Sequence, residues 1–275
     1  MTPTSTLYEV FSFSFRVLAP SLAISSAVDF MYEALRARRH RAPDLEVAIR
    51  PVEGDRYRLE VFLAGQSAFS VGRLGDLLHT LDNHITVAME QAIPRYYFVH
   101  AAALAHEGKV TLIVGESGAG KSTTAYALAS SGFDYLSDEL SPIDPQTGLV
   151  FPYPRAFCLK DDPPPPLNVP RRHLRTEWTL HIQARDLPCR IVTDPLPLAR
   201  IVFVRYSSGH AAARLKPVTP GEASLWLYKN ALNQLAHPSL GLDDTLSLVQ
   251  RARCLELEAA GIEDTVRVLR EDANH

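Results

Sequence analysis

In the N-terminal third, some segments alternate hydrophobic and polar residues as strands do, and others repeat hydrophobic residues at the spacing of a helix. Residues 5–18 are rich in Phe, Tyr and Val with partial alternation, which predicts a strand. Residues 27–39 carry apolar side chains at helical spacing and predict a short amphipathic helix. Residues 45–51 and 57–63 predict an antiparallel hairpin, and residues 68–71 a third strand beside it.

A long helix and a proline mark the end of this first region. Apolar positions recur at helical spacing over residues 74–93, and Pro94 ends the pattern. The elements up to that point predict a small N-terminal α+β portion over residues 1–94. We expect the remainder, residues 95–275, to form an α/β domain of its own.

Two strands joined by a turn lead into a glycine-rich segment. Residues 96–104 predict a buried strand, and Glu107, Gly108 and Lys109 turn the chain into a second strand at residues 110–114. The next segment, residues 115–122, reads Gly-Glu-Ser-Gly-Ala-Gly-Lys-Ser and matches G-x-x-x-x-G-K-[ST], and an Ala- and Leu-rich helix follows it. A strand-turn-strand entry differs from a simple βαβ repeat.

This glycine loop, residues 115–122, has the composition of a phosphate-binding site. Glycines let main-chain N–H groups converge on an anion, and the helix that begins near Gly120 directs its positive end at the same place. Lys121 adds a mobile positive charge for the outer phosphates, and the Ser122 hydroxyl is able to ligate Mg²⁺. The residues predicted to bind the nucleotide are Gly115, Glu116, Ser117, Gly118, Ala119, Gly120, Lys121, Ser122 and Thr123.

Two acidic residues follow the next predicted strand, residues 133–136. The end of a parallel strand lies beside the glycine loop, so carboxylates of Asp138 and Glu139 there can reach Mg²⁺ or a substrate hydroxyl. Adjacent strand residues point to opposite faces, so we expect only one of the two to point directly at the γ-phosphate. A solvated turn is the alternative interpretation.

Four other residues are weaker candidates. A lone histidine such as His100 is more often a hydrogen-bonded core residue, but its position beside the strand that feeds the loop makes it a candidate for stabilising charge or sharing a proton. Arg155, Lys160 and Arg205 could each neutralise a transferring phosphoryl group. For any single one of these three, an ordinary surface cation is the favoured interpretation.

The C-terminal half combines a proline-rich stretch with further strands and helices. Prolines exclude regular helix over much of residues 142–170, which predicts either a functional loop or disorder. A capping box at Thr219 and Glu222 predicts a helix that continues through Leu235. The other predicted elements are a strand at 201–204, a helix at 242–253, a strand at 254–257 and a closing helix at 262–269.

Composition restricts the class of protein. The 275 residues are 46% hydrophobic and carry a net charge of -3, so nothing in the charge balance suggests a nucleic-acid partner. The short basic run at residues 36–41 predicts a solvated helix end. Cys158, Cys189 and Cys254 are odd in number and lack C-x-x-C spacing, so neither disulfides nor zinc are expected. No signal peptide or membrane-spanning segment is visible, which predicts a soluble cytoplasmic protein without a membrane partner.

Four segments together resemble the catalytic core of the HPr kinase/phosphorylase family. They are residues 99–104, 115–122, 136–140 and 154–160, and the resemblance covers about residues 96 to 160 well. It implies an α/β fold with a P-loop kinase core of the type shared with phosphoenolpyruvate carboxykinase. That core would account for the pair of antiparallel strands that leads into the glycine loop.

The resemblance also implies an activity, that of an ATP- and Mg²⁺-dependent kinase. It assigns Asp138 as the base that accepts the proton of a substrate serine hydroxyl, and it places His100 near the phosphates. Lys121 takes the phosphate-binding role in catalysis, and Ser122 and Glu139 are expected to hold the metal.

The chain departs from the bacterial regulator of that family in ways that concern the acceptor. Glu139 stands where the regulator has a second Asp, the first ninety or so residues differ, and its glycine- and arginine-rich loop is not found. HPr as substrate and a reverse phosphorylase activity are therefore in doubt.

The closer match is to HPr kinase-like proteins of biosynthetic clusters, including kinases of lasso-peptide precursors. The expected acceptor is a serine of a peptide or protein. The alternatives are a small-molecule kinase acting on an amino acid or sugar hydroxyl and a nucleotide-binding regulator without transfer, and a homo-oligomer stays open.

Overall fold

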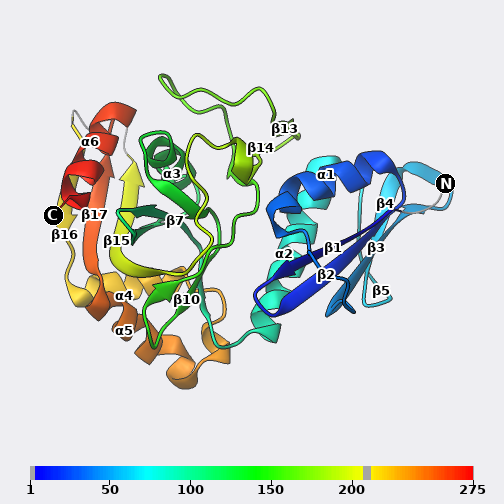
Figure 1. The fold of residues 1–275 in the computed structure, drawn as a ribbon, viewed down its shortest axis with the longest axis horizontal. Helices are drawn as coiled ribbons and strands as arrows, with labels where there is room; N and C mark the ends of the chain where they lie inside the picture. Colours follow the sequence, from blue (N-terminus) through cyan, green and yellow to red (C-terminus); the bar gives the residue numbers. More distant parts are fainter. Residues whose placement is uncertain (1–3, 207–211, 275) are drawn as a thin grey trace.

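The computed structural model describes residues 4–206 and 212–274, and this part of the chain has a mixed α/β fold (Figure 1). The N-terminal portion contains a five-stranded sheet in the order β1-β2-β3-β4-β5. Its strands are β1 (Thr4–Val10), β2 (Phe13–Ala19), β3 (Leu45–Val52), β4 (Asp55–Leu63) and β5 (Gln66–Val71). Helices α1 (Leu22–Tyr32) and α2 (Leu74–Ala92) pack on this sheet, so the predicted α+β composition is present.

The prediction for residues 5–39 is wrong in its boundaries. The single strand expected at 5–18 is a hairpin of β1 and β2, which turns at Phe11 with φ 55°. Helix α1 begins earlier than predicted because the Ser21 side chain accepts a hydrogen bond from the Ile24 N–H at 3.4 Å. It ends at Tyr32, and a 3-10 turn at Glu33–Leu35 follows.

The basic run at residues 36–41 lies after the end of the helix, so the predicted helix end is wrong there, whereas residues 38–41 are exposed to solvent as predicted. Arg36 forms an ion pair with Asp29, and Arg41 forms one with Asp44 at 2.9 Å. These arginines fasten the segment between α1 and β3 to its neighbours.

The central sheet has the order β6-β10-β11-β15-β8-β7-β9, and β17 and β16 extend it beside β15. Its strands are β6 (Tyr97–Val99), β7 (Ala101–His106), β8 (Lys109–Val114), β9 (Asp134–Ser137), β10 (Ser141–Asp144), β11 (Leu149–Val150), β15 (Leu196–Tyr206), β16 (Arg214–Pro217) and β17 (Arg253–Ala259). A third, small sheet has the order β12-β14-β13, with β12 (Phe157–Leu159), β13 (Leu174–Arg175) and β14 (Leu180–Ile182).

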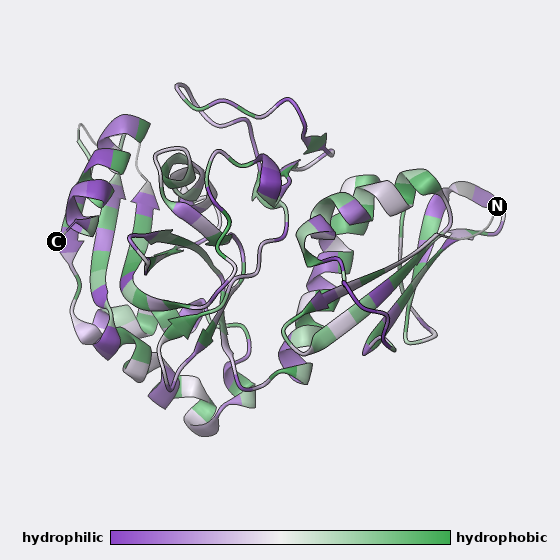
Figure 2. Ribbon diagram, in the orientation of Figure 1, coloured by the Kyte–Doolittle hydropathy of each residue, from purple (hydrophilic) through white to green (hydrophobic). Residues whose placement is uncertain are grey.

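Helices cover both faces of the central sheet. Alternate side chains of β8 enter different cores: Ile113 packs on the side of α3 (Lys121–Ala129) and α6 (Ile262–Ala273), and Leu112 packs on the side of α4 (Pro220–Lys229) and α5 (Leu242–Arg251). In Figure 2, α6 alternates hydrophilic and hydrophobic residues, as expected for a helix with one face on the core.

The strand-turn-strand entry to the glycine loop is confirmed. Strands β7 and β8 are antiparallel neighbours, and β9 is antiparallel to β7, so β9 runs parallel to β8 with β7 between them. The strand predicted at 96–104 is broken at His100 into β6 and β7, because β6 pairs with β10 while β7 pairs with β8 and β9. His100 therefore lies at a break between two strands.

Two predictions about the C-terminal half have different outcomes. The capping box of α4 is present, but the helix ends at Lys229 rather than at Leu235. It ends there because Leu232 N–H donates to Phe98 O at 2.9 Å, which pulls the chain onto β6. Residues 142–170 form no helix, as the prolines predict, and they contribute β10, β11 and β12.

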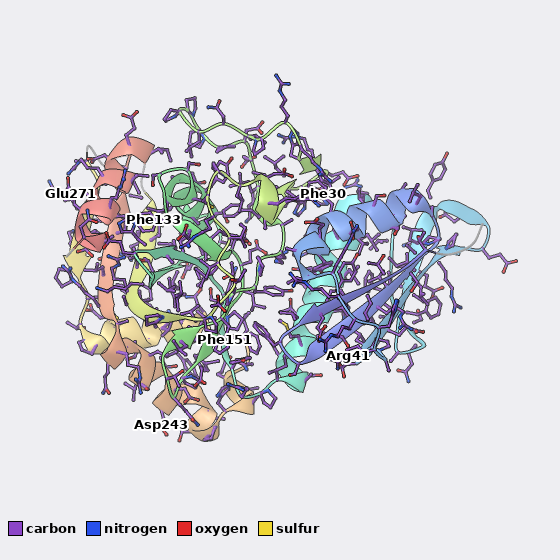
Figure 3. All side chains as sticks on the ribbon, viewed as in Figure 1. Phe30, Arg41, Phe133, Phe151, Asp243 and Glu271 are labelled. Carbon is purple, nitrogen blue, oxygen red and sulfur yellow. The ribbon has the colours of Figure 1, made fainter. Side chains whose placement is uncertain are left out.

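The two portions share one hydrophobic core where they meet. The ring of Phe151, labelled in Figure 3, lies tilted at 4.5 Å from the ring of Tyr96 and edge to face at 5.9 Å from that of Phe11 in the β1–β2 turn. The Ala156 N–H also donates to Met31 O of α1 at 2.8 Å. The division into residues 1–94 and 95–275 stays a prediction about folding units, and the two units would be joined through this core.

Candidate functional site

A cavity of about 670 Å³ lies where the N-terminal portion faces the glycine loop. Helix α2 contributes one wall through Gly75, Asp76 and Asp82. The glycine loop and the start of α3 contribute the opposite wall. Residues 158–162 together with Trp178, Thr179 and His181, from the small sheet and the segments beside it, complete the lining. In Figure 1 the strands β13 and β14 lie between α3 and helix α1.

The glycine loop adopts a conformation that depends on its glycines. Gly118 and Gly120 have φ of 86° and 90°, a region that residues with a Cβ rarely adopt. A Cβ added to Gly115 would lie 3.2 Å from the carbonyl oxygen of Val204, which leaves no easy space for a side chain. Both ends of the loop are therefore fixed by sterics, and α3 starts directly after Gly120.

Most of the predicted nucleotide-binding residues line the cavity. They are Glu116, Ser117, Gly118, Gly120, Lys121, Ser122 and Thr123. Gly115 and Ala119 do not line it, and a Cβ added at Gly115 would lie 3.3 Å from the Ala119 Cβ. The two predicted metal ligands, Ser122 and Glu139, line the same cavity.

Lys121 and His100 form a buried pair at the centre of this wall. The Lys121 ammonium donates a hydrogen bond of 2.7 Å to Nε2 of His100. Burial, and after it the positive charge of Lys121, lowers the pKa of His100, so the imidazole is neutral and accepts the bond. Burial also lowers the pKa of Lys121, against the opposing charges of Glu139 and Asp138. An anion in the cavity would stabilise the charged form of both side chains.

Arg155 occupies the middle of a carboxylate cluster and is 3% exposed. Its guanidinium forms ion pairs with Asp82 of α2 at 3.1 Å and with Glu139 at 2.7 Å, and it lies 3.9 Å from Asp138. Asp82 also accepts a hydrogen bond from the Tyr32 hydroxyl at 2.8 Å. The interpretation of Arg155 as a surface cation is wrong, because this residue joins the two portions beneath the cavity.

The two adjacent acids occupy different environments. The Asp138 carboxylate is buried and accepts hydrogen bonds from the main-chain N–H groups of Glu139 at 2.7 Å and of Cys158 at 2.8 Å. It is not among the residues that line the cavity, whereas Glu139 lines it with a side chain that is 39% exposed. In this structure Glu139 is therefore the acid that faces the glycine loop.

The pKa values of Asp138 and Glu139 differ as their environments do. Burial, reinforced by the charge of Glu139, raises the pKa of Asp138 to about 7. Burial acts on Glu139 as well, but Arg155, Lys121 and His100 outweigh it and hold the pKa of Glu139 below its usual value. At neutral pH the pair therefore offers one ionised carboxylate and one group near its titration point.

Of the other two candidate cations, one lies at the site and one does not. The Lys160 ammonium donates to the Ser117 hydroxyl at 2.6 Å, so it extends over the glycine loop. Arg205 pairs with Glu256 at 2.9 Å on the surface and does not line the cavity. A surface role is the correct interpretation for Arg205 alone.

The tip of the small sheet closes the cavity against α2. Glu177 accepts a hydrogen bond from the Gly75 N–H at 3.0 Å, and Trp178 Nε1 donates to the Asp76 carboxylate at 2.9 Å. Helix α2 has no capping side chain of its own at Arg73, so Glu177 satisfies a free N–H of its first turn from another element. A Cβ on Gly75 would lie 2.7 Å from the Trp178 ring, so glycine is required for this contact.

The chain has a distant structural similarity to a protein of known activity. No family model matches the chain, and no curated protein matches it. Among solved structures, the HPr(Ser) kinase/phosphatase from Coxiella burnetii aligns with 12% identity over 65% of this chain and 99% of that one, at a TM-score of 0.31. Agreement at that level supports no conclusion about this chain, so the site has to be judged on its own residues.

Several residues of the cavity were not predicted from the sequence. Asp82 occupies a position in α2 four residues after the buried Leu78 and three before the buried Ile85, and a charged residue in an apolar stripe was the available signal. His181 and Trp178 gave no comparable signal, because their positions depend on how the small sheet docks.

Over residues 4–206 and 212–274, no group of three or more His, Cys, Asp or Glu residues is arranged to hold a metal by itself. Within the same ranges, no helix has the length and apolarity needed to cross a bilayer. The three cysteines are all free thiols, as the sequence predicts.

Proposed function

We propose that this protein is an ATP-dependent kinase that transfers the γ-phosphoryl group to a hydroxyl, first of all a serine of a peptide or protein. One observation carries the proposal: the glycine loop, Lys121 and the ionised Glu139 line a single cavity. Phosphoryl transfer requires N–H groups and a cation for the phosphates and a carboxylate near them, and this cavity contains each of these groups.

The site suits Mg²⁺ bound together with ATP. Ser122 and Glu139 offer the oxygen ligands that Mg²⁺ prefers, and Mg²⁺ commonly completes its shell with phosphate oxygens and water rather than with a full set of protein ligands. When bound, the metal would neutralise charge on the phosphates.

The roles of the chain's own residues follow from their surroundings. Lys121 holds the outer phosphates, and His100 orients Lys121 through their hydrogen bond. Asp138 is the proposed base, and a pKa of about 7 suits a group that must take up a proton at neutral pH. To reach a hydroxyl, Asp138 must exchange a main-chain hydrogen bond for the acceptor, so the base role requires a local rearrangement beside Cys158.

The shape of the cavity supports a second candidate, a small-molecule kinase. The contact of Glu177 and Trp178 with α2 bounds the cavity between the small sheet and α2. An amino acid or sugar with a free hydroxyl fits such a bounded space, as does the end of a peptide chain.

Incubation with γ-labelled ATP, Mg²⁺ and a set of hydroxyl acceptors tests the proposal. We expect label on an acceptor with the wild-type protein and none with Lys121→Ala. Asp138→Asn and Glu139→Gln separate the two acids: loss of turnover with nucleotide affinity retained supports Asp138 as the base, and wild-type turnover in Asp138→Asn contradicts it. Bound ATP without transfer to any acceptor would indicate a nucleotide-binding regulator instead.

A further inference from the structure

The small sheet presents one face to the hydrophobic core and the other to the cavity. Leu180 and Ile182 of β14 are fully buried in the core on the side of α3. Because side chains alternate along a strand, His181 points to the opposite face. Its cross-strand partner on β12 is Cys158, and both residues line the cavity.

His181 has one nitrogen with a partner and one without. Its side chain is 4% exposed, and Nε2 forms a hydrogen bond of 2.7 Å with the Thr179 hydroxyl. Nδ1 is buried and has no hydrogen-bond partner among the described residues. A buried polar atom without a partner is costly, and native proteins satisfy such atoms with protein groups, water or ligand.

The charge state of His181 limits what its free nitrogen would bind. Burial, and after it the positive charge of Arg155, lowers the pKa of His181 to about 4, so the ring is neutral at neutral pH. A neutral imidazole has one N–H and one lone pair, so the free Nδ1 either donates or accepts a single hydrogen bond. His181 lines the same cavity as Arg155 and Glu139, so the ring lies on the side of the proposed transfer site.

We propose that His181 is a positioning residue for the acceptor, whose hydroxyl or another neutral polar group forms a hydrogen bond with Nδ1 in the cavity. The inference rests on the proposed function and specifies which wall of the cavity receives the acceptor. The nucleotide occupies the wall of the glycine loop, and the acceptor occupies the wall of β12 and β14. The acceptor is then a hydroxyl-bearing molecule bound against β12 and β14.

Three substitutions of His181 distinguish the two nitrogens. Asn places a polar atom near the position of Nδ1, Gln places one near the position of Nε2, and Leu places none at either. Transfer from γ-labelled ATP to L-serine, glycerol and a serine-containing tripeptide is measured for each variant. For the acceptor that wild type uses, His181→Leu and His181→Gln are expected to raise the acceptor KM about tenfold, the effect of one lost hydrogen bond.

The matched control is His181→Asn, which is expected to keep the acceptor KM within about threefold of wild type. The KM for ATP is expected to change less than the KM for the acceptor in all three variants, and urea unfolding checks that each is folded. An unchanged acceptor KM in His181→Leu overturns the inference and leaves the proposed kinase intact. An equal rise in all three variants, with the KM for ATP rising as well, also overturns it in favour of a purely structural role.

A failure of the proposed function gives a different result. In that case wild type labels none of the three acceptors, and the inference fails with the kinase assignment. Shifts of the His181 ¹⁵N resonances provide a second measurement that does not depend on turnover. Addition of the acceptor that wild type labels, in the presence of Mg²⁺ and a non-hydrolysable ATP analogue, is expected to shift Nδ1 more than Nε2, and no shift of Nδ1 counts against the inference.

Discussion

The two walls of the cavity are built in opposite ways. Apart from His100, the wall of the glycine loop comes from one segment, residues 115–123, whose conformation is set by its own glycines and by the start of α3. The wall of α2 exists only through long-range contacts, such as the hydrogen bonds of Gly75 with Glu177 and of Asp76 with Trp178, each 102 residues apart in sequence. The glycine-loop wall can therefore be recognised in the sequence, whereas the α2 wall can be recognised only in the folded structure.

The difference extends to electrostatics. On the loop wall, Lys121 and His100 leave positive charge and N–H groups for a phosphate to use. On the α2 wall, Asp82 is already committed to Arg155 and Tyr32. The loop wall is therefore suited to binding an anion, whereas the charges of the α2 wall hold the two portions together.

The largest expected effect tests the loop wall. Lys121→Ala should reduce phosphoryl transfer by about a thousandfold or more, because it removes the cation that would stabilise charge on the outer phosphates. Transfer from γ-labelled ATP measures the loss. Lys109→Ala, an exposed lysine at the start of β8, is the control and should transfer at the wild-type rate. Equal activity in Lys121→Ala and Lys109→Ala would show that the glycine loop does not bind the phosphates of ATP.

The next effect tests the α2 wall through stability. Arg155→Leu should lower the free energy of unfolding by about 3 to 5 kcal/mol, because it leaves Asp82 buried without its ion-pair partner. Urea unfolding measures the loss. The double variant Arg155→Leu with Asp82→Leu should recover part of it, since the unpaired charge is then removed.

The surface pair of Arg205 and Glu256 provides the control for that experiment. Arg205 is 73% exposed in its ion pair, and exposed pairs contribute about 0 to 1 kcal/mol. Arg205→Leu should therefore leave stability nearly unchanged. A loss in Arg155→Leu no larger than in Arg205→Leu would show that the two portions are not joined through this ion pair.

A third effect concerns Asp138, which lies behind both walls. Its pKa is about 7 in the folded state and about 4 in an unfolded chain, so the folded state holds a proton that unfolding releases. The contribution of this group to stability is therefore present below about pH 4 and is lost as the pH rises to about 7, a change on the order of a few kcal/mol.

Asp138→Asn should remove that part of the pH dependence, because an amide does not titrate in this range. Urea unfolding of both proteins between pH 4 and 8 compares the slopes, which do not depend on the cost of placing an amide beside two N–H groups. The same slope in wild type and variant would mean that Asp138 is ionised in the folded protein throughout.

The smallest expected effect concerns the contact that closes the cavity. Glu177→Ala should lower the free energy of unfolding by about 1 kcal/mol, the usual contribution of a helix cap, because the Gly75 N–H then loses its partner. Chemical denaturation gives the value, and Glu263→Ala on the exposed face of α6 is the comparison. A change below the error of the measurement would show that α2 is not capped by the small sheet.

Much of the fold could be predicted because its signals are local. The glycine loop, the capping box of Thr219 and Glu222 and the hairpin of β3 and β4 each depend on residues a few positions apart. The break at His100 and the end of α4 at Lys229 could not be predicted, because both result from β6 pairing with distant residues.

The site divides in the same way. Most residues of the glycine loop line the cavity where they were expected, and so does Glu139. Arg155 was undervalued, since a sequence does not show that three carboxylates surround it. The free nitrogen of His181 is visible only once β14 is placed against β12.

The position of Trp178 gives the cavity an optical signal of its own. Trp178 lines the cavity, is 54% exposed and donates to Asp76. The second tryptophan, Trp226, does not line the cavity and meets the Phe203 ring edge to face at 5.2 Å. Indole emission responds to the polarity around the ring, so a molecule that enters beside α2 changes the fluorescence of Trp178 and leaves that of Trp226 unaltered. In a Trp226→Phe background, binding to this wall can be followed by intrinsic emission without any label.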